Sequence, residues 1–218
     1  MRVSKVMCAL TYAGILMIGS VAFAGEPAAD SYDLTWLGLD GARFIDANGL
    51  VYAESTQIAD NGLVLGRNRS YNGTMTNLGD AWWVSDGTTT TRIGLFDADH
   101  TKSTGYQHAY TQAALSSALG TQAGGLFVFG ESQKYRDDDS TISNTPWVYD
   151  STTGTTTALG LTGPEYTHAD GYTQPSRWEG GANGNFAGMS VIFNGGTSSV
   201  GTASWVYDHE AGTHTRVG

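Results

Sequence analysis

The feature that most constrains the fold is a short pattern that returns three times along the chain. Trp-Val-x-Asp begins at Trp83, Trp147 and Trp205, at intervals of 64 and 58 residues. Self-similarity at a roughly constant spacing is typical of chains that stack copies of one small structural unit. We therefore expect successive copies of one unit rather than a single irregular domain.

A second pattern, Thr-x-apolar-Gly-Leu, keeps the same order relative to the first. It occupies residues 35–39, 91–95 and 157–161, and residues 215–218 begin a further copy. The glycines of this pattern, which include Gly94 and Gly160, are predicted to be structural. Because the two patterns recur in the same order in each copy, the repetition is not explained by chance.

Each unit reads as four antiparallel strands. A Gly-Tyr strand comes first, and the Trp-Val strand and a Thr-rich strand come last. Between them lies an apolar run opened by glycine: residues 62–66, 125–130 and 188–193. Side chains alternate along a strand, so Trp147 and Tyr149 are expected to share one face. Asp86-Gly87 predicts a two-residue type I′ hairpin turn.

These strands predict an all-β fold of four-stranded antiparallel units, and favour a β-propeller-like arrangement over a β-solenoid or a sandwich. The units are expected at about residues 40–95, 96–161 and 162–218, after one strand at 32–39. Closed propellers have about 4–8 blades. We therefore expect an incomplete propeller of about three blades, an abbreviated relative of a longer one.

The first 24 residues read as a signal peptide. Arg2 and Lys5 make its start basic, residues 6–21 are apolar or small, and residues 22–24 are Ala-Phe-Ala. Cleavage is expected directly after this triplet, with residues 25–31 as a linker. The alternative is an uncleaved membrane anchor, because the apolar run is nearly long enough to span a bilayer.

The leader predicts an exported protein, located outside the cell, at the cell surface or in the periplasm. The chain carries 11 Lys+Arg against 21 Asp+Glu, a formal net charge of -10. Such a surface repels nucleic acid, so none is expected as a partner. No second apolar run follows, so we expect no membrane insertion after cleavage. Cleavage also removes Cys8, the only cysteine, and with it any thiol chemistry.

The order of glycine-opened strand, Trp-Val-Tyr-Asp, Thr-Gly turn and Gly-Leu resembles the bacterial extracellular proteins called HAF-repeat proteins. It is also similar in layout to kelch blades, whose third strand carries Tyr-Asp. The resemblance covers residues 32–218. It implies an extracellular location and a propeller-like fold, but no particular activity.

The tryptophans divide into two groups. Those of the recurring pattern hold equivalent positions, which favours burial between units. Three others lie outside the repeat: Trp36, Trp82 and Trp178. Exposed indoles can stack on sugar rings, so these three are the candidates for binding a ligand such as a glycan.

The sequence offers one acidic cluster as a candidate metal site and no catalytic motif. Asp137, Asp138 and Asp139 are a candidate site for Ca²⁺, which takes about 6–8 oxygen ligands, and a solvated turn is the alternative. No other cofactor is expected. The chain has no G-x-S-x-G or H-E-x-x-H motif, so no catalytic residue is assigned. His100 aligns with Tyr166, which favours a packing role.

The leading hypothesis is an exported, non-enzymatic repeat protein that interacts with a glycan or a protein at a surface or in a matrix. One alternative is a secreted propeller enzyme that acts on polysaccharide. Another is a truncated, non-functional fragment of a longer repeat protein. Open strand edges invite pairing with another chain, so self-association is also expected.

When a bacterial host exports the full chain, we expect the mature protein to begin at Gly25. The basic start and the apolar run direct export, and the small residues before Gly25 suit the peptidase. N-terminal sequencing and intact mass of the exported protein check this. Ala24→Tyr, with a large side chain at the cleavage site, should block processing. Recovery of the unmodified chain uncleaved in the membrane fraction would support the anchor instead.

Overall fold

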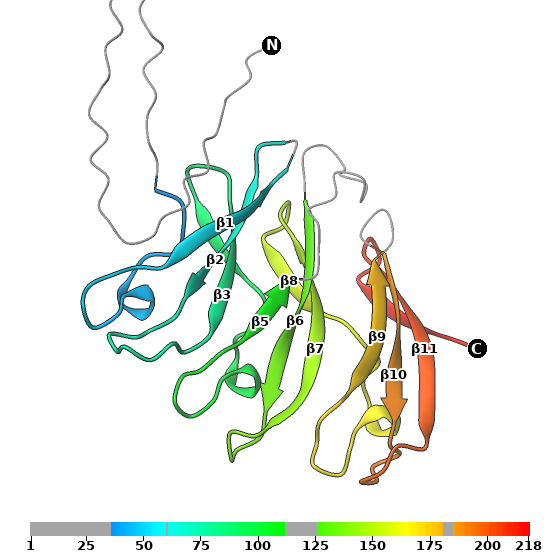
Figure 1. Ribbon diagram of the computed structural model, residues 1–218. Helices are drawn as coiled ribbons and strands as arrows, with labels where there is room; N and C mark the ends of the chain where they lie inside the picture. Colours follow the sequence, from blue (N-terminus) through cyan, green and yellow to red (C-terminus); the bar gives the residue numbers. More distant parts are fainter. Residues whose placement is uncertain (1–35, 60, 112–125, 181–184) are drawn as a thin grey trace, which may run out of the picture. The chain divides into compact units, whose positions relative to one another are not determined.

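The computed structural model describes residues 36–59, 61–111, 126–180 and 185–218 (Figure 1). The predicted leader, the linker and residues 32–35 of the strand predicted at 32–39 lie outside these ranges. Residues 36–39 are described and form no strand, so the prediction is wrong there. All the described strands belong to one compact unit, residues 37–218. No α-helix occurs among the described residues, and the prediction of an all-β fold is confirmed.

Three antiparallel sheets contain four strands each, and each strand pairs with its neighbours along the chain. The first sheet contains β1 (Ala53–Ile58), β2 (Val64–Arg69), β3 (Asp80–Ser85) and β4 (Thr90–Ile93). The second contains β5 (Ala109–Thr111), β6 (Phe127–Tyr135), β7 (Thr141–Asp150) and β8 (Thr155–Ala158). The third contains β9 (Pro175–Gly180), β10 (Phe186–Ile192), β11 (Gly201–Asp208) and β12 (Thr213–Val217). One short 3-10 turn precedes each sheet: η1 (Ala42–Phe44), η2 (Ala98–His100) and η3 (Pro164–Tyr166).

In each sheet a glycine of the second strand lies opposite a tryptophan of the third. The pairs are Gly66 with Trp83, Gly130 with Trp147, and Gly188 with Trp205. All three tryptophans are at most 1% exposed. A Cβ at Gly66 would overlap the six-membered ring of Trp83 and the backbone carbonyl of Glu54. The missing side chain therefore leaves the space in which the ring lies.

A buried polar side chain stands two residues after each of these glycines. The three residues are Asn68, Ser132 and Ser190. Their side-chain oxygens accept hydrogen bonds at 3.0 Å from the backbone N–H groups of Leu39, Leu95 and Leu161 respectively. These leucines end the Thr-x-apolar-Gly-Leu segments. Because a buried backbone donor needs a partner, this hydrogen bond fastens each sheet to the segment that enters it.

The glycines of the Gly-Leu pairs adopt backbone conformations that other residues rarely take. Gly94 has a φ of 105° and Gly160 a φ of 127°. A Cβ at Gly160 would also lie 2.9 Å from Cγ of Pro175, the first residue of β9. One at Gly94 would lie 3.5 Å from the ring of Trp147. Backbone conformation therefore favours glycine at both positions, and at Gly160 the lack of space for a side chain adds to it.

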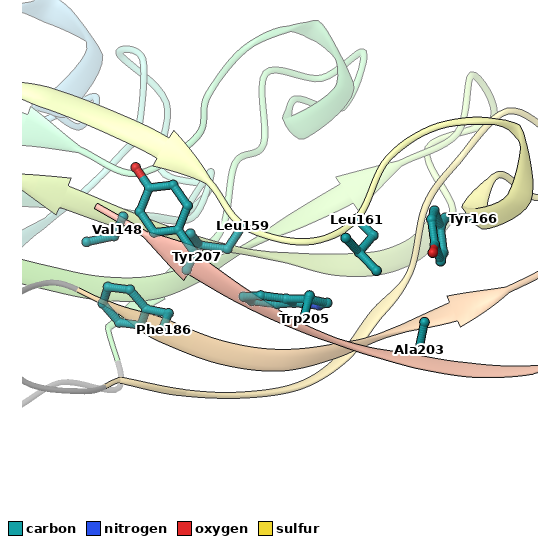
Figure 2. Close-up of a cluster of buried hydrophobic side chains, with 8 residues drawn as sticks. All are labelled: Val148, Leu159, Leu161, Tyr166, Phe186, Ala203, Trp205 and Tyr207. Carbon is teal, nitrogen blue, oxygen red and sulfur yellow. The ribbon is translucent and has the colours of Figure 1, made fainter. Parts of the chain in front are cut away.

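Apolar side chains fill the space between successive sheets. The first and second sheets share one buried cluster: Leu65, Val84, Ile93, Leu126, Val128, Trp147 and Tyr149. The second and third share another, drawn in Figure 2: Val148, Leu159, Leu161, Tyr166, Phe186, Ala203, Trp205 and Tyr207. Trp147 and Tyr149 fall in one cluster and Val148 in the other, as the two faces of one strand require. The second sheet is therefore covered on both faces.

The prediction of a two-residue turn at Asp86-Gly87 is wrong. Four residues, 86–89, separate β3 from β4. The reason is the Asp86 carboxylate, whose Oδ1 accepts hydrogen bonds at 2.8 Å from the backbone N–H groups of Thr88 and Thr89. These bonds, with the one from Thr89 strongest, lower the pKa of Asp86 to about 2.

We expect Ser132→Ala to lower the free energy of unfolding more than Ser190→Ala does. Ser132 Oγ accepts hydrogen bonds from the Leu95 N–H and from Trp147 Nε1, both at 3.0 Å. Ser190 Oγ accepts only the backbone bond among the described residues, and Trp205 Nε1 is buried without a partner there. Leaving a buried donor unpaired costs about 1–3 kcal/mol, which is the expected difference between the variants.

Urea denaturation followed by tryptophan fluorescence measures both variants. The two serines hold the same position in different sheets, so each variant serves as the control for the other. Equal losses would show that the indole hydrogen bond contributes nothing to stability.

Candidate functional site

The three tryptophans predicted to bind sugars have different surroundings. Trp36 is 64% exposed. Trp82 in β3 is half-buried, and its indole N–H donates a hydrogen bond at 2.9 Å to the carbonyl oxygen of Ala109 in β5. Trp178 lies in β9, and its side chain is outside what the structure describes. The ring of Trp82 thus joins the first two sheets, and Trp36 presents the more open stacking surface.

The acidic residues predicted as a calcium site form the turn between β6 and β7. This turn closes with a hydrogen bond from the Arg136 N–H to the Ser140 carbonyl oxygen at 2.9 Å. Asp138 Oδ1 accepts from the Ser140 N–H at 2.9 Å. Asp139 accepts from the N–H of Ser103 at 2.6 Å and from its hydroxyl at 2.5 Å. Hydrogen bonds from the two serines lower the pKa of both carboxyls.

Asp139 therefore fastens this turn to the segment that precedes β5. Asp137 is exposed beside it. Among the described residues, no three His, Cys, Asp or Glu side chains gather closely enough to hold a metal ion. Calcium binding by Asp137, Asp138 and Asp139 stays a prediction.

One polar group around the buried His100 has the composition of a catalytic triad. Nδ1 of His100 lies 2.7 Å from Asp97 Oδ1, and Nε2 lies 3.1 Å from Thr145 Oγ1. A carboxylate, an imidazole and a hydroxyl in this order can activate a nucleophile. Asp97 also caps η2, where its carboxylate accepts from the backbone N–H of His100 at 3.2 Å. His100 is 6% exposed.

The corresponding places in the other two sheets hold apolar contacts. Phe44 ends η1 and Tyr166 ends η3, as His100 ends η2. Phe44 shares a buried cluster with Ala81, and Tyr166 shares one with Ala203. Each alanine stands two residues before the buried tryptophan of its sheet. Thr145 holds the same place before Trp147 in the second sheet. The histidine contact is therefore a polar form of a core contact, and we assign it no catalytic role.

A second polar cluster was not predicted from the sequence. Arg43 of η1 and Arg92 of β4 converge on the side-chain oxygen of Gln107, just before β5. Arg43 Nη2 donates to Gln107 Oε1 at 2.6 Å and to the carbonyl oxygen of Gly105 at 3.0 Å. Arg92 Nη2 donates to the same Gln107 oxygen. The guanidinium carbon of Arg92 lies 4.2 Å from the centre of the Phe96 ring.

No described carboxylate lies within 4 Å of either guanidinium group of this cluster, although Arg67, Arg136 and Arg216 all form ion pairs. Burial, followed by the charge of Arg43, lowers the pKa of Arg92 to about 10. Two like charges close together repel each other, which is why the charge of Arg43 adds to the effect of burial. The cluster is therefore a local concentration of positive charge in an acidic chain.

One sequence signal pointed toward this cluster. The Thr-Arg-x-Gly segment at Arg92 recurs at Arg216, which marks an arginine on the fourth strand of two units. Arg43 carries no such signal, because it lies in a different pattern and only the fold brings it beside Arg92.

The comparisons with known proteins assign no family to the chain. No family model, no curated protein and no solved structure matches it. Within the ranges that the structure describes, no helix has the length and the hydrophobicity needed to cross a bilayer.

Combining His100→Phe with Thr145→Ala should leave the free energy of unfolding within about 1 kcal/mol of the wild type. The double variant gives the second sheet the contact that Phe44 and Ala81 make in the first. It removes the imidazole and the hydroxyl together, and the Asp97 carboxylate that remains is 62% exposed and keeps the backbone N–H of residue 100. His100→Ala alone leaves a cavity and should cost about 2–5 kcal/mol. Urea denaturation measures all three proteins. A large loss in the double variant would contradict the packing interpretation of His100.

Proposed function

We propose that this chain is an exported, non-enzymatic repeat protein of β-propeller-like construction that acts through interactions at a cell surface or in a matrix. Residues 1–24 support the proposal of export. The Gly–Trp pairs and the hydrogen bonds to the Gly-Leu segments, shared by all three sheets, support the repeat. The observation that carries the interaction is an open apolar face on the third sheet.

One valine marks this face in each sheet. Val84, Val148 and Val206 directly follow the buried tryptophans, so they lie on the opposite face of the strand. Val84 is 4% exposed and packs with the second sheet, and Val148 is 1% exposed and packs with the third. Val206 is 39% exposed. The face that receives the next sheet is therefore covered in the first two sheets and open in the third.

The open face extends over the neighbouring strands. Ala187 of β10 pairs with Val206 and is exposed. Val217 of β12 is 51% exposed and pairs with Ser204, two residues from Val206 on the same face. Apolar residues that are exposed together on several strands are typical of interaction surfaces.

The partner that suits this face is a further sheet of the same construction, and a second copy of the chain supplies one. Both contacts between sheets place a valine face against the tryptophan face of the following sheet. In the first sheet the corresponding residues are already covered: Val64, Ala81 and Trp83 are at most 4% exposed and pack with Leu39 and Phe44. The open valine face of the third sheet of a second copy is the surface that remains, and a contact between these two equivalent faces forms a two-fold dimer.

The remaining surface is available to a different partner. Trp36, which is 64% exposed, is the more exposed of the two described candidates for stacking on a glycan. The net charge of -10 disfavours nucleic acid in this role. We therefore propose a glycan or a protein as the surface partner of the assembled chain.

Size-exclusion chromatography with light scattering on residues 25–218 tests the interaction. The mass should rise with concentration toward a dimer, and Val206→Asp should return it to that of a monomer, because a buried unpaired charge is costly. Val200→Asp is the matched control, since Val200 is 65% exposed in the loop before β11. A wild-type monomer at every concentration would contradict the proposed contact.

A further inference from the structure

The strand arginine of the third sheet, unlike that of the first, is paired with a carboxylate. Arg92 lies opposite Trp83 in the first sheet, and Arg216 lies opposite Trp205 in the third. The two arginines therefore hold the same place. Arg216 Nη1 donates to Glu165 Oε1 at 2.8 Å. This ion pair shows what the strand arginine binds when a carboxylate is present.

Arg43 and Glu165 also hold corresponding places. Each is the second residue of its 3-10 turn, in η1 and η3 respectively. The carbonyl oxygen of each accepts two backbone N–H groups from the loop between the second and third strands of its sheet. The distances are 2.8 and 2.9 Å at Arg43, and both are 2.9 Å at Glu165. The first sheet thus carries an arginine where the third carries the glutamate.

This exchange leaves two cations around one neutral oxygen. Gln107 is 7% exposed, and its Nε2 donates to the Phe96 carbonyl oxygen at 3.0 Å and to Thr101 Oγ1 at 2.5 Å. Both donor hydrogens of the amide are used in this way, so Oε1 is held toward Arg43 and Arg92. An amide oxygen carries only a partial negative charge. It positions the two guanidinium groups without neutralising them.

Further donors of the two arginines remain for a ligand. Both residues are half-buried, and Nη1 of each has no hydrogen-bond partner among the described residues. The Nε atoms of both are buried and also lack partners there, whereas the Nη1 atoms retain access to solvent. Phe96, which lies against the Arg92 guanidinium, is 44% exposed and offers apolar surface beside these donors.

We propose that Arg43 and Arg92 form a binding site for a carboxylate carried by a ligand. One Nη1 donor from each guanidinium group can address each of the two oxygens of a carboxylate, and Arg216 Nη1 makes such a contact with Glu165 within the chain. The exposed Phe96 ring suits the carbon skeleton of the ligand. The class of ligand is a small organic acid, either free or as an acidic sugar of a glycan. The site does not depend on self-association through the third sheet.

Thermal unfolding in sodium glucuronate, with sodium chloride at the same ionic strength as the reference, tests the site. The midpoint should rise with glucuronate concentration beyond its value in chloride, because a ligand that binds the folded chain stabilises it. Arg43→Glu supplies the carboxylate that the third sheet has at Glu165, so it should abolish the glucuronate response and raise the midpoint without ligand. Arg92→Gln should weaken binding by about tenfold or more.

Arg69→Gln is the matched control. Arg69 is an arginine of β2 whose guanidinium stacks on Tyr52 at 4.2 Å, outside the cluster, and its variant should keep the wild-type response. Acetate in parallel distinguishes the two sources. A rise equal to that in glucuronate indicates recognition of the carboxylate alone, and a larger rise in glucuronate indicates an acidic sugar.

Titration of the wild-type protein with glucuronate tests the site without relying on the folding of any variant. Glucuronate should shift the ¹⁵N NMR signals of two arginine Nε–H groups in a saturable way, and chloride should not. Equal responses to chloride and to both carboxylates would overturn the site, since screening of the two arginine charges would then account for the effect. A glucuronate response that survives in both Arg43→Glu and Arg92→Gln would overturn it as well.

Discussion

The indole laid across a glycine is the contact on which each sheet depends. Trp83 occupies the space that a side chain at Gly66 would fill, and truncation of a buried aromatic residue of this size typically costs about 3–5 kcal/mol. The ring covers one face of the strand pair, which leaves the valine after it to pack on the other face. Asn68, two residues beyond the glycine, then holds the backbone of Leu39. Ring, glycine and polar side chain together set how the chain enters the sheet and which face each neighbour covers.

Against this constant framework, the residues of the 3-10 turns change their chemistry. The last residue of the turn is Phe44, His100 or Tyr166, and each is buried. The residue before it is Arg43 in the first sheet, whereas the acids at this place in the other sheets are both paired with cations: Asp99 with Lys134 at 2.8 Å, and Glu165 with Arg216. Stability comes from positions that hardly vary, and specificity is expected where equivalent positions differ.

The sequence anticipated the second and third strands of each sheet because their signals are local. Alternation of side chains and the recurring glycines located these strands and placed Trp147 and Tyr149 on one face. The prediction that the first strands carry Gly-Tyr was wrong, because β5 and β9 begin three residues after Tyr106 and Tyr172. The sequence also failed at Asp86-Gly87, where the aspartate accepts backbone hydrogen bonds of its own loop. It also could not show that Trp82 donates to Ala109 of another sheet, since that bond joins segments 27 residues apart.

The amino-acid sequence was enough to determine the all-β class, the order of the strands and the positions that must be glycine. Each of these depends on backbone geometry over a few residues. The charge of -10 likewise needs no structure. The tertiary structure alone decided which side chains from different patterns meet. Arg43 and Arg92 come together because one precedes the first sheet and the other ends it, and the packing of the second sheet brings Gln107 between them. It also decided that Val206 is exposed while Val84 and Val148 are buried, because identical residues differ only in whether another sheet covers them.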